Sequence, residues 1–309
     1  MVDETPHKYD VIVIGCGVWG SATLWALVKR GYRVLGLDQH TPPHKHGSHG
    51  GATRLARMSN STGTQYTRLT SVTMDLWREL GSEVGKQIIV KTGTMFAGEV
   101  GSLWFDNTLA NLADSGFEYE VMTPETAMQR VPGLRIQPRE SVVWEPSGGI
   151  ILVEPAITGL HQVARELGAE LVFDQPVLDW TADSQGVEVR TPQALYTADK
   201  LVVAAGSFAK TLLAIDLPMT IERQVLFNFP VPSGTPTLPS LYFSAPPGTQ
   251  AAPAYGCPEP DGSYKVSVAS SGDPVVPEAM VQTITDADIE RVRKGVRERL
   301  PMLGEEPIA

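Results

Sequence analysis

The sequence predicts a mixed α/β (α+β) protein in which a discontinuous Rossmann-like domain is interleaved with a domain of antiparallel sheet. Three observations support this fold class. A strand, a glycine-rich turn, a helix and a second strand follow one another over residues 8–38. Alternating strand and helix patterns return over 149–215. The segments 85–148 and 216–309 carry short strand patterns and isolated helices, which is typical of antiparallel sheet.

The first unit begins with an apolar strand at 8–14, which runs into Gly15-Cys16-Gly17-Val18-Trp19-Gly20 and a helix pattern ending near Arg30. A second strand, 33–37, ends in Asp38. A G-x-G-x-x-G turn between strand and helix, with an acidic residue about twenty positions later, is the pattern of a dinucleotide-binding site. The alternative is a tight strand–helix turn that binds no ligand.

Each residue of this motif has an expected task. Gly15 permits the tight turn, Gly17 lets a pyrophosphate approach the backbone, and Gly20 lets the helix pack closely on the strand. The helix N-terminus offers free N–H groups and the positive end of its dipole to phosphates. Asp38 is expected to accept hydrogen bonds from a ribose.

The predicted helices share apolar residues at helical spacing, usually with a capping or stop residue at one end. They are expected at 18–30, 66–80 (stopped by Gly81), 102–113, 124–130 (capped by Thr123), 155–167 (stopped by Gly168) and 286–300 (capped by Thr285).

The strand patterns are short apolar or alternating runs between turn residues. They are expected at 8–14, 33–37, 170–173, 177–180, 187–190, 196–198, 201–205, 220–229, 254–256 and 264–268, with a hairpin of two short strands within 88–98. Residues 230–248 hold six prolines and are predicted to form a long loop.

These patterns predict two interleaved domains. The first, nucleotide-binding domain comprises 1–84 and 149–215, and the second, a substrate or catalytic domain, comprises 85–148 and 216–309.

Composition excludes several classes of protein. The net charge is −10 and no block of Lys or Arg stands out, so nucleic acid is not expected as a partner. No apolar run approaches the roughly 20 residues of a membrane helix, and the acidic N-terminus lacks the apolar core of a signal peptide. The two cysteines, Cys16 and Cys257, provide neither a disulfide framework nor metal-ligand spacing. A reducing, cytoplasmic location is expected.

The loop after the second strand reads Pro42-Pro43-His44-Lys45-His46-Gly47-Ser48-His49, followed by Gly50-Gly51-Ala52-Thr53-Arg54-Leu55-Ala56-Arg57. With the glycine motif, this loop resembles the monomeric sarcosine oxidase and N-methyltryptophan oxidase family. These are FAD-dependent amine oxidases of the D-amino-acid-oxidase-like fold. The resemblance continues through 65–66, 76–80, 148–149, 203–206, 223–225, 255–258 and Lys265.

The resemblance implies FAD as the cofactor, a small amino-acid or amine substrate, oxygen as electron acceptor, and a monomer. By matching position, Arg57 binds the substrate carboxylate, Lys265 lies where oxygen is activated, and Tyr255 lines the substrate cavity. A bidentate guanidinium–carboxylate pair is a sensible way to hold an amino acid. Taken alone, Arg57 reads as a surface or ion-pair arginine and Lys265 as a solvated edge lysine.

The residues assigned to FAD lie in the glycine motif, at the end of the second strand, in the histidine-rich loop and in the later Rossmann-like segment. They are Gly15, Gly17, Val18, Trp19, Gly20, Asp38, Gln39, His46, Ser48, His49, Thr53, Arg54, Val177, Ala205 and Gly206. A metal site at the loop histidines is not expected, because no carboxylate or cysteine completes it.

The sequence also departs from the family pattern. Gly50, Ala52, Met58 and Ala269 stand where relatives carry His, Asp, His and His. The chain ends before the family segment that carries the cysteine linked to FAD, so no covalent link and weak flavin retention are expected. Three alternatives stay open: a flavin dehydrogenase with another electron acceptor, an NAD-dependent dehydrogenase, and a non-catalytic flavin- or nucleotide-binding protein.

Overall fold

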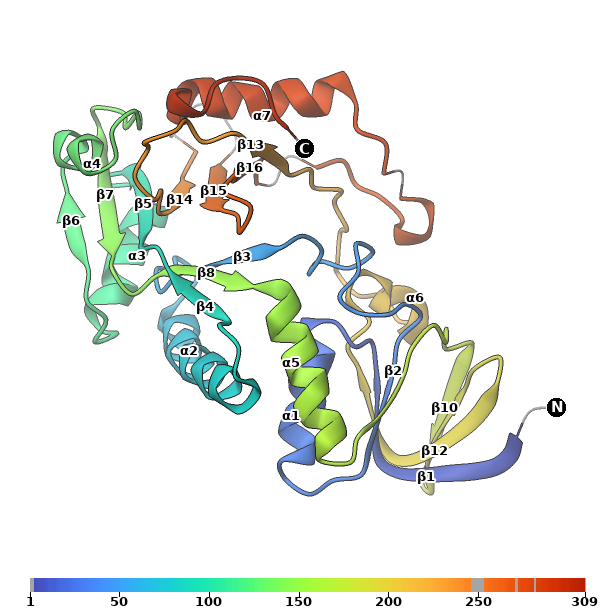
Figure 1. Cartoon of the computed structure of the whole chain (residues 1–309). Helices are drawn as coiled ribbons and strands as arrows, with labels where there is room; N and C mark the ends of the chain where they lie inside the picture. The colour runs from blue at the N-terminus through green and yellow to red at the C-terminus, as the bar shows by residue number, and fades with distance from the viewer. Residues whose placement is uncertain (1–2, 246–252, 270–271, 281, 309) are drawn as a thin grey trace. The chain divides into compact units, whose positions relative to one another are not determined.

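Residues 3–245, 253–269, 272–280 and 282–308 are described by a computed structural model, which is drawn in Figure 1. The chain divides into two compact units, each assembled from three segments. The first unit comprises Met1–Gly51, Arg78–Ile88 and Val153–Met219, and the second comprises Ala52–Trp77, Ile89–Leu152 and Thr220–Ala309. Residues 52–77, which the sequence analysis grouped with the N-terminal segment, therefore belong to the second unit.

The first unit contains a six-stranded sheet in the order β10-β11-β12-β1-β2-β9. Its strands are β1 (Asp3–Ile14), β2 (Val34–Leu37), β9 (Glu170–Val172), β10 (Asp179–Asp183), β11 (Gly186–Arg190) and β12 (Ala194–Val203). The four strands β12, β1, β2 and β9 are parallel, whereas β10 and β11 extend the edge as antiparallel strands. This is the open, mostly parallel sheet of a doubly wound fold.

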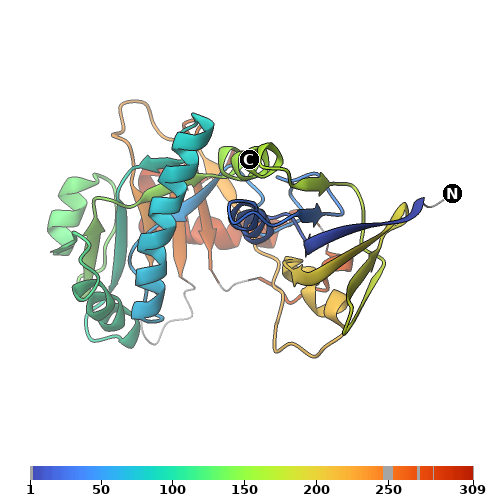
Figure 2. The same ribbon diagram turned by 90° about the horizontal axis from the view of Figure 1, so that it is seen from below.

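Alternation along β1 explains how both faces of this sheet are covered. Val11 and Val13 face helices α1 (Val18–Val28) and α5 (Val153–Glu166), which lie side by side against the sheet (Figure 2). Ile12 and Ile14 point to the opposite face and pack with residues of β2 and β11. A strand buried on both faces reads as a continuous apolar run, and that is the sequence signal at 11–14.

The second unit contains two sheets. The larger has seven strands in the order β13-β16-β15-β14-β5-β7-β6, and the smaller has the order β3-β8-β4. The strands are β3 (Thr53–Ala56), β4 (Ile89–Lys91), β5 (Thr94–Glu99), β6 (Glu120–Met122), β7 (Glu140–Glu145), β8 (Gly149–Leu152), β13 (Phe227–Phe229), β14 (Ser240–Phe243), β15 (Ala254–Pro258) and β16 (Tyr264–Val268). All pairs are antiparallel except β14 with β5.

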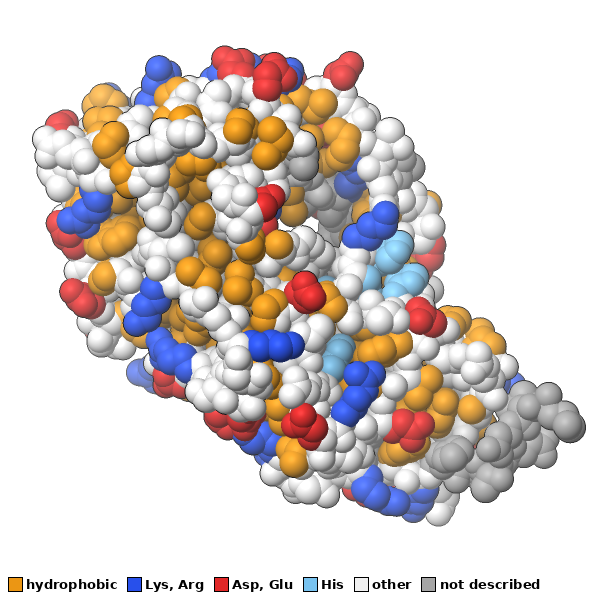
Figure 3. Space-filling view, viewed as in Figure 1, with side chains coloured by type: hydrophobic (Ala, Val, Ile, Leu, Met, Phe, Trp, Pro, Cys, Tyr) orange, Lys and Arg blue, Asp and Glu red, His pale blue; other side chains and the backbone are white. Residues whose placement is uncertain are grey.

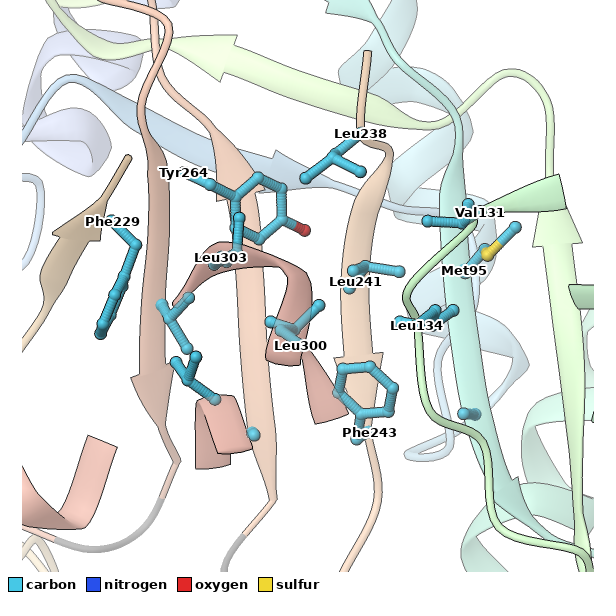
Figure 4. Close-up of a cluster of buried hydrophobic side chains, with 14 of the residues drawn as sticks. Met95, Val131, Leu134, Phe229, Leu238, Leu241, Phe243, Tyr264, Leu300 and Leu303 are labelled. Atoms are coloured by element: carbon cyan, nitrogen blue, oxygen red, sulfur yellow. The ribbon is translucent and has the colours of Figure 1, made fainter. Parts of the chain in front are cut away.

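The main core of the second unit lies on one face of the seven-stranded sheet. Figure 4 shows apolar side chains of the strands beside Leu300 and Leu303, which follow helix α7 (Asp286–Arg299). Phe229 and Tyr264 are completely buried there. The N-terminus of α7 carries a capping box, in which Thr285 and Asp288 satisfy each other's backbone N–H groups.

Of the remaining helices, α2 (Thr64–Val84), α3 (Leu103–Ala113) and α4 (Pro124–Arg130) match the sequence patterns in type, whereas α6 (Ala209–Leu213) had not been predicted. Short 3₁₀ turns lie at Gly206–Phe208, Pro277–Ala279 and Pro301–Leu303. Ser102 and Thr123 cap α3 and α4 by accepting from backbone N–H groups. In the described residues, no helix is both long and apolar enough to cross a membrane.

Four local predictions were wrong. Helix α2 continues past Gly81 to Val84, because glycine in a helix interior only weakens a helix. The two strands within 88–98 do not form a hairpin, since β4 pairs with β8 and β5 pairs with β7 and β14. The strand expected at 220–229 is reduced to β13. The predicted loop 230–248 contains β14, which lies at the centre of the seven-stranded sheet and pairs with β15 and β5, while its last residues, 246–248, lie outside the described part of the chain.

Candidate functional site

The glycine turn after β1 is held by contacts that leave no room for side chains. Gly15 has a φ of +92°, and a Cβ there would lie 2.5 Å from the Ala204 carbonyl oxygen. A Cβ on Gly20 would lie 1.7 Å from the Gly15 carbonyl oxygen. Both positions therefore require glycine, the first for its left-handed backbone and the second for close approach.

The N-terminus of α1 is open to an anion. Its N-cap residue is Gly17, and no side chain caps the helix. The first N–H groups of a helix have no partner within the helix, and they carry the positive end of its dipole. A Cβ on Gly17 would lie 3.0 Å from the His49 Nδ1 atom, so this edge of the turn is also closely packed. The backbone geometry fits the diphosphate of a dinucleotide such as FAD.

Strand register brings three predicted segments to one edge of the first sheet. Ile14 is paired with Val203 on one side and with Leu37 on the other, so β12, β1 and β2 end together. The residues that follow, Ala205 with Gly206, the glycine turn, and Asp38 with Gln39, leave this carboxyl edge. Ligands of doubly wound sheets bind outside this edge.

Asp38 has a structural task that the sequence did not show. Its carboxylate is buried, and Oδ2 accepts from the Cys16 N–H at 2.7 Å while Oδ1 accepts from the His40 N–H at 2.9 Å. The carboxylate therefore holds the backbone of the glycine turn and the start of the following loop in place. An ionised carboxylate has about four acceptor positions, so these two bonds leave capacity for the expected ribose contact.

The histidines of the loop after β2 form a packed group. His40 stacks on His46 with ring centroids 4.2 Å apart, and His44 meets His49 edge-on at 4.7 Å. Burial lowers the pKa of His44, which favours its neutral form although Asp38 lies 3.5 Å away. Adjacent histidine side chains are visible on the face shown in Figure 3. The described residues contain no group of His, Cys, Asp and Glu arranged to hold a metal ion.

The other predicted cofactor residues of the first unit differ in exposure. Trp19 is 81% exposed, Val18 and Ser48 are also exposed, and His49 is buried. Ala205 precedes a 3₁₀ turn, in which Gly206 has a φ of +56° and open space around its Cα. Val177 packs against the core of the sheet, so it is in part a structural residue.

In the second unit, Arg57 directly follows β3 and lies next to aromatic rings. Its guanidinium donates to the Ser59 carbonyl oxygen at 2.7 Å and lies 5.1 Å from the centroid of the Tyr242 ring. Ser59 is its only hydrogen-bond acceptor among the described residues. A guanidinium has five N–H donors, so most donors of this partly buried cation lack an acceptor in the described structure.

A buried carboxylate fixes the turn that carries Arg57. Glu145, at the end of β7, is fully buried and accepts from the Met58 N–H at 2.7 Å and the Ser59 N–H at 2.9 Å. Burial raises the pKa of Glu145, whereas these hydrogen bonds and Arg57 act in the opposite direction. No sequence signal singled out Glu145, because an acid at a strand end is common.

Aromatic side chains continue from Arg57 across the sheet. Tyr242 is nearly parallel to Tyr255, with ring centroids 6.3 Å apart, and is stacked on Trp104 at 5.2 Å. Trp104 in turn stacks on Phe96 at 4.0 Å. The structure therefore brings the predicted Tyr255 and Arg57 to the same aromatic row, with Tyr242 between them as a residue that sequence reasoning missed.

Lys265 lies in β16 and is only 5% exposed. Its ammonium donates to the Thr53 carbonyl oxygen at 2.9 Å and to Thr53 Oγ1 at 2.6 Å, and it forms an ion pair with Glu259 at 2.5 Å. Thr53 Oγ1 donates to the same Glu259 carboxylate. The description of Lys265 as a solvated edge lysine is therefore wrong.

Two further side chains border this buried group. Cys257 is completely buried with its Sγ 3.3 Å from Thr53 Oγ1, and burial raises the pKa of its thiol. Arg54 donates to the Thr53 carbonyl oxygen at 2.7 Å, and burial lowers its pKa. Sequence reasoning selected Thr53, Arg54 and Lys265 but missed Glu259, which lies in a hairpin turn without a recognisable motif.

Comparison with known proteins agrees with this arrangement. A family model described as DAO, FAD dependent oxidoreductase, matches residues 10–309. Monomeric sarcosine oxidase of Streptomyces avermitilis is 31% identical over 304 residues, which cover 96% of this chain and 78% of that protein. The monomeric sarcosine oxidase of Bacillus sp. strain B-0618 is also 31% identical, over 72% of this chain and 58% of its own length. N-methyl-L-tryptophan oxidase of Salmonella typhimurium is 31% identical over 86% of this chain and 71% of its own.

Solved structures show the same fold. NikD, described as an unusual amino acid oxidase essential for nikkomycin biosynthesis, superimposes with a TM-score of 0.86 at 27% identity, over 98% of this chain and 80% of its own. L-proline dehydrogenase from P. horikoshii gives a TM-score of 0.81 at 22% identity, over 96% of this chain and 78% of its own, and supports the fold alone. The glycine turn, the sheet order and the family match agree, and the chain belongs to the DAO family of FAD-dependent oxidoreductases.

Proposed function

We propose that this chain is an FAD-dependent oxidase of secondary (N-methyl) amino acids, which oxidises the C–N bond to an imine while oxygen is reduced to hydrogen peroxide. The observation that carries this proposal is Arg57. A partly buried guanidinium with most of its donors lacking an acceptor in the described structure is suited to a carboxylate. Sarcosine and N-methyltryptophan, which name two of the relatives, are both N-methyl amino acids.

FAD binding is assigned to the glycine turn, the N-terminus of α1 and the loop after β2. The free backbone N–H groups at the start of α1, next to Gly17, would hold the diphosphate, Gly15 and Gly20 would shape the turn, and Asp38 would accept hydrogen bonds from the ribose. FAD, when bound, supplies the acceptor for the two electrons of the C–N bond. We propose non-covalent binding, because both cysteines of the printed sequence, Cys16 and Cys257, are completely buried.

Substrate orientation is assigned to the aromatic row and Arg57. The guanidinium would hold the substrate carboxylate by paired hydrogen bonds, and Tyr242 and Tyr255 would border the rest of the molecule. Glu145 keeps the Met58–Ser59 backbone in place, and this fixes the position of the neighbouring Arg57 backbone from which the guanidinium extends. Oxygen reduction is assigned to the neighbourhood of Lys265, where a cation stabilises the negative charge that develops on oxygen to the extent that the paired carboxylate leaves its charge uncancelled. We further propose a monomer, by analogy with the monomeric sarcosine oxidases among its relatives, and a reducing compartment, since both thiols are free.

The test replaces Arg57 by methionine and compares two kinds of substrate. For N-methyl amino acids, the Arg57→Met variant should raise KM about 10- to 100-fold, the range expected when hydrogen bonds to a charged group are lost. For secondary amines without a carboxylate, KM should not change. Arg68, an exposed arginine of α2, provides the control variant Arg68→Met, which should behave as the unchanged protein. An unchanged KM for N-methyl amino acids in Arg57→Met would refute the carboxylate role.

A second candidate function is supported by the ion pair between Lys265 and Glu259. An amine dehydrogenase that passes its electrons to an acceptor other than oxygen would share the flavin and amine sites. Measured with one N-methyl amino acid, oxygen consumption that keeps pace with substrate loss supports the oxidase. Dye reduction without oxygen consumption supports the dehydrogenase.

A further inference from the structure

The Lys265 ammonium is surrounded by oxygen atoms of the protein itself. A lysine ammonium has three N–H donors and no acceptor. Three oxygens lie within hydrogen-bonding distance of Nζ: the Thr53 carbonyl oxygen at 2.9 Å, Thr53 Oγ1 at 2.6 Å and Glu259 Oε1 at 2.5 Å. Two of its three donors are therefore hydrogen-bonded to Thr53, and its charge is paired with Glu259.

The Glu259 carboxylate is placed there by a tight hairpin between β15 and β16. The Glu259 N–H donates to the Ser263 carbonyl oxygen at 2.9 Å, and the Gly262 N–H donates to the Glu259 carbonyl oxygen at 3.1 Å. The side chains of Glu259 and Lys265 are only 5% and 6% exposed. A buried carboxylate kept against a buried ammonium cancels its charge in a medium where solvent screens little.

We propose that Glu259 is a positioning residue that holds and neutralises the Lys265 ammonium, and so makes the reduced cofactor react slowly with dioxygen. The inference rests on the proposed function in assigning oxygen reduction to the neighbourhood of Lys265. It adds a residue, Glu259, that sets the rate of that step. While Lys265 is paired with Glu259, its contribution to oxygen reduction is small.

The physical reason is the charge that oxygen acquires. Dioxygen takes two electrons and two protons from the reduced cofactor and leaves as hydrogen peroxide, and negative charge develops on oxygen as the first electron arrives. A lone ammonium stabilises that charge. An ammonium with a carboxylate 2.5 Å away is a dipole, whose field falls off much more steeply with distance than that of a single charge.

The first experiment measures oxygen reactivity without any amine. The protein with bound FAD is photoreduced without oxygen and mixed with buffers of known oxygen concentration, and the second-order rate constant of reoxidation is recorded. Glu259→Gln keeps an oxygen that accepts from Thr53 Oγ1 but removes the negative charge beside Lys265, so the rate constant should rise about 10-fold, a change of 1.4 kcal/mol in the barrier. A rate constant equal to or below that of the unchanged protein would overturn the proposal.

Asp261→Asn is the matched control, because Asp261 lies in the same hairpin turn but is exposed. Its Oδ1 accepts from the Ser263 N–H at 2.9 Å, a bond that asparagine can keep. The rate constant of this variant should equal that of the unchanged protein. A rise equal to that of Glu259→Gln would assign the effect to the loss of any acid in the turn and would overturn the role of Glu259.

The double variant Lys265→Met/Glu259→Gln answers the case in which Glu259→Gln does not fold, since removing both members of a buried pair is often tolerated. Its rate constant should lie within about threefold of the unchanged protein, because a neutralised lysine contributes little. A loss of tenfold or more would show that Lys265 acts at full strength despite Glu259, and would overturn the proposal.

A third readout needs neither FAD nor oxygen. In the full chain without cofactor, Glu259→Gln leaves a buried cation without its counter-charge, which should take up a small anion. Replacing sodium gluconate by sodium chloride at constant ionic strength should raise Tm by several degrees in Glu259→Gln and by less than one degree in the unchanged protein and Asp261→Asn. Equal shifts in all three would contradict a neutralising role. None of these measurements uses an amine, so their outcome does not depend on whether the chain oxidises amines.

Discussion

The glycine turn of the first unit and the Lys265 group of the second unit are built in opposite ways. The turn uses six consecutive residues, and the conformation of its backbone forms the site. Gly15 is left-handed, the helix starts uncapped at Gly17, and Gly20 lies in close approach to Gly15. The Lys265 group uses side chains separated by about two hundred positions, Thr53 with Glu259 and Lys265. The glycine turn depends on the absence of side-chain atoms, whereas the Lys265 group depends on opposite charges that cancel.

The difference teaches where each site is vulnerable. A backbone-made site fails when any atom is added, because a close-packed turn has no room to relax. A site made of opposite charges fails when one charge is removed alone, because the remaining charge is buried without a partner. Two predictions test this contrast, and a third concerns His161, which reaches the glycine-turn backbone through Ser21; they run from the largest expected effect to the smallest.

The strongest effect is expected from Gly20→Ala. The added Cβ would lie 1.7 Å from the Gly15 carbonyl oxygen, so the turn must open, and a loss of more than about 4 kcal/mol in the free energy of unfolding is expected. Urea unfolding measures this, with FAD retention as a second readout. Gly295→Ala in α7 is the control, because its Cβ meets only ordinary contacts at 3.6 and 3.7 Å, and alanine favours helix by up to about 1 kcal/mol. Equal stability of the two variants would contradict the spatial argument.

The second prediction concerns charge in the Lys265 group. Lys265→Met leaves Glu259 buried without its cation and should lower the free energy of unfolding by about 3–5 kcal/mol. Adding Glu259→Gln should recover most of this loss, because no uncompensated charge then remains. Denaturant unfolding of both single variants and the double variant measures the coupling between the two residues, expected at about 2–3 kcal/mol. Simple additivity of the two single changes would show that the pair is not coupled.

The third prediction uses His161, a buried histidine of α5 in the first unit. Ser21 Oγ donates to the Cys16 carbonyl oxygen at 2.7 Å, so His161 Nε2, also 2.7 Å from Ser21 Oγ, carries the proton and donates. Burial lowers the pKa of His161 from 6.5 to about 4. The unfolded chain therefore binds more protons between these values, and stability is complete above pH 6.5 and lost as the pH falls toward 4.

The lowered pKa of His161 corresponds to about 3 kcal/mol of stability near pH 4 relative to pH 7. His161→Gln removes the titrating group and should flatten the decline in the free energy of unfolding between pH 6.5 and 4. His46→Gln, at an exposed histidine of the same unit, should leave the decline unchanged. A pH profile that is identical in His161→Gln and in the unchanged protein would contradict the assignment.

Much of the fold was predictable because its signals are local. The helices at 103–113, 124–130 and 286–299 were confirmed nearly to the residue, and so were the caps predicted at Thr123 and Thr285, since a cap is a property of adjacent residues. Pairing partners were less predictable. The strands within 88–98 are adjacent in sequence but join different sheets, because pairing depends on which distant strand offers an edge.

The sequence by itself determined the glycine turn, the fold class and the family, and it pointed to Arg57, Tyr255 and Lys265 by resemblance. Tertiary structure alone decided what surrounds them. It placed Glu145 under the backbone next to Arg57 and brought Glu259 to Lys265. The physical reason is that a glycine motif encodes a conformation within a few bonds, whereas a buried charge acquires its partner only when distant strands pair and exclude water.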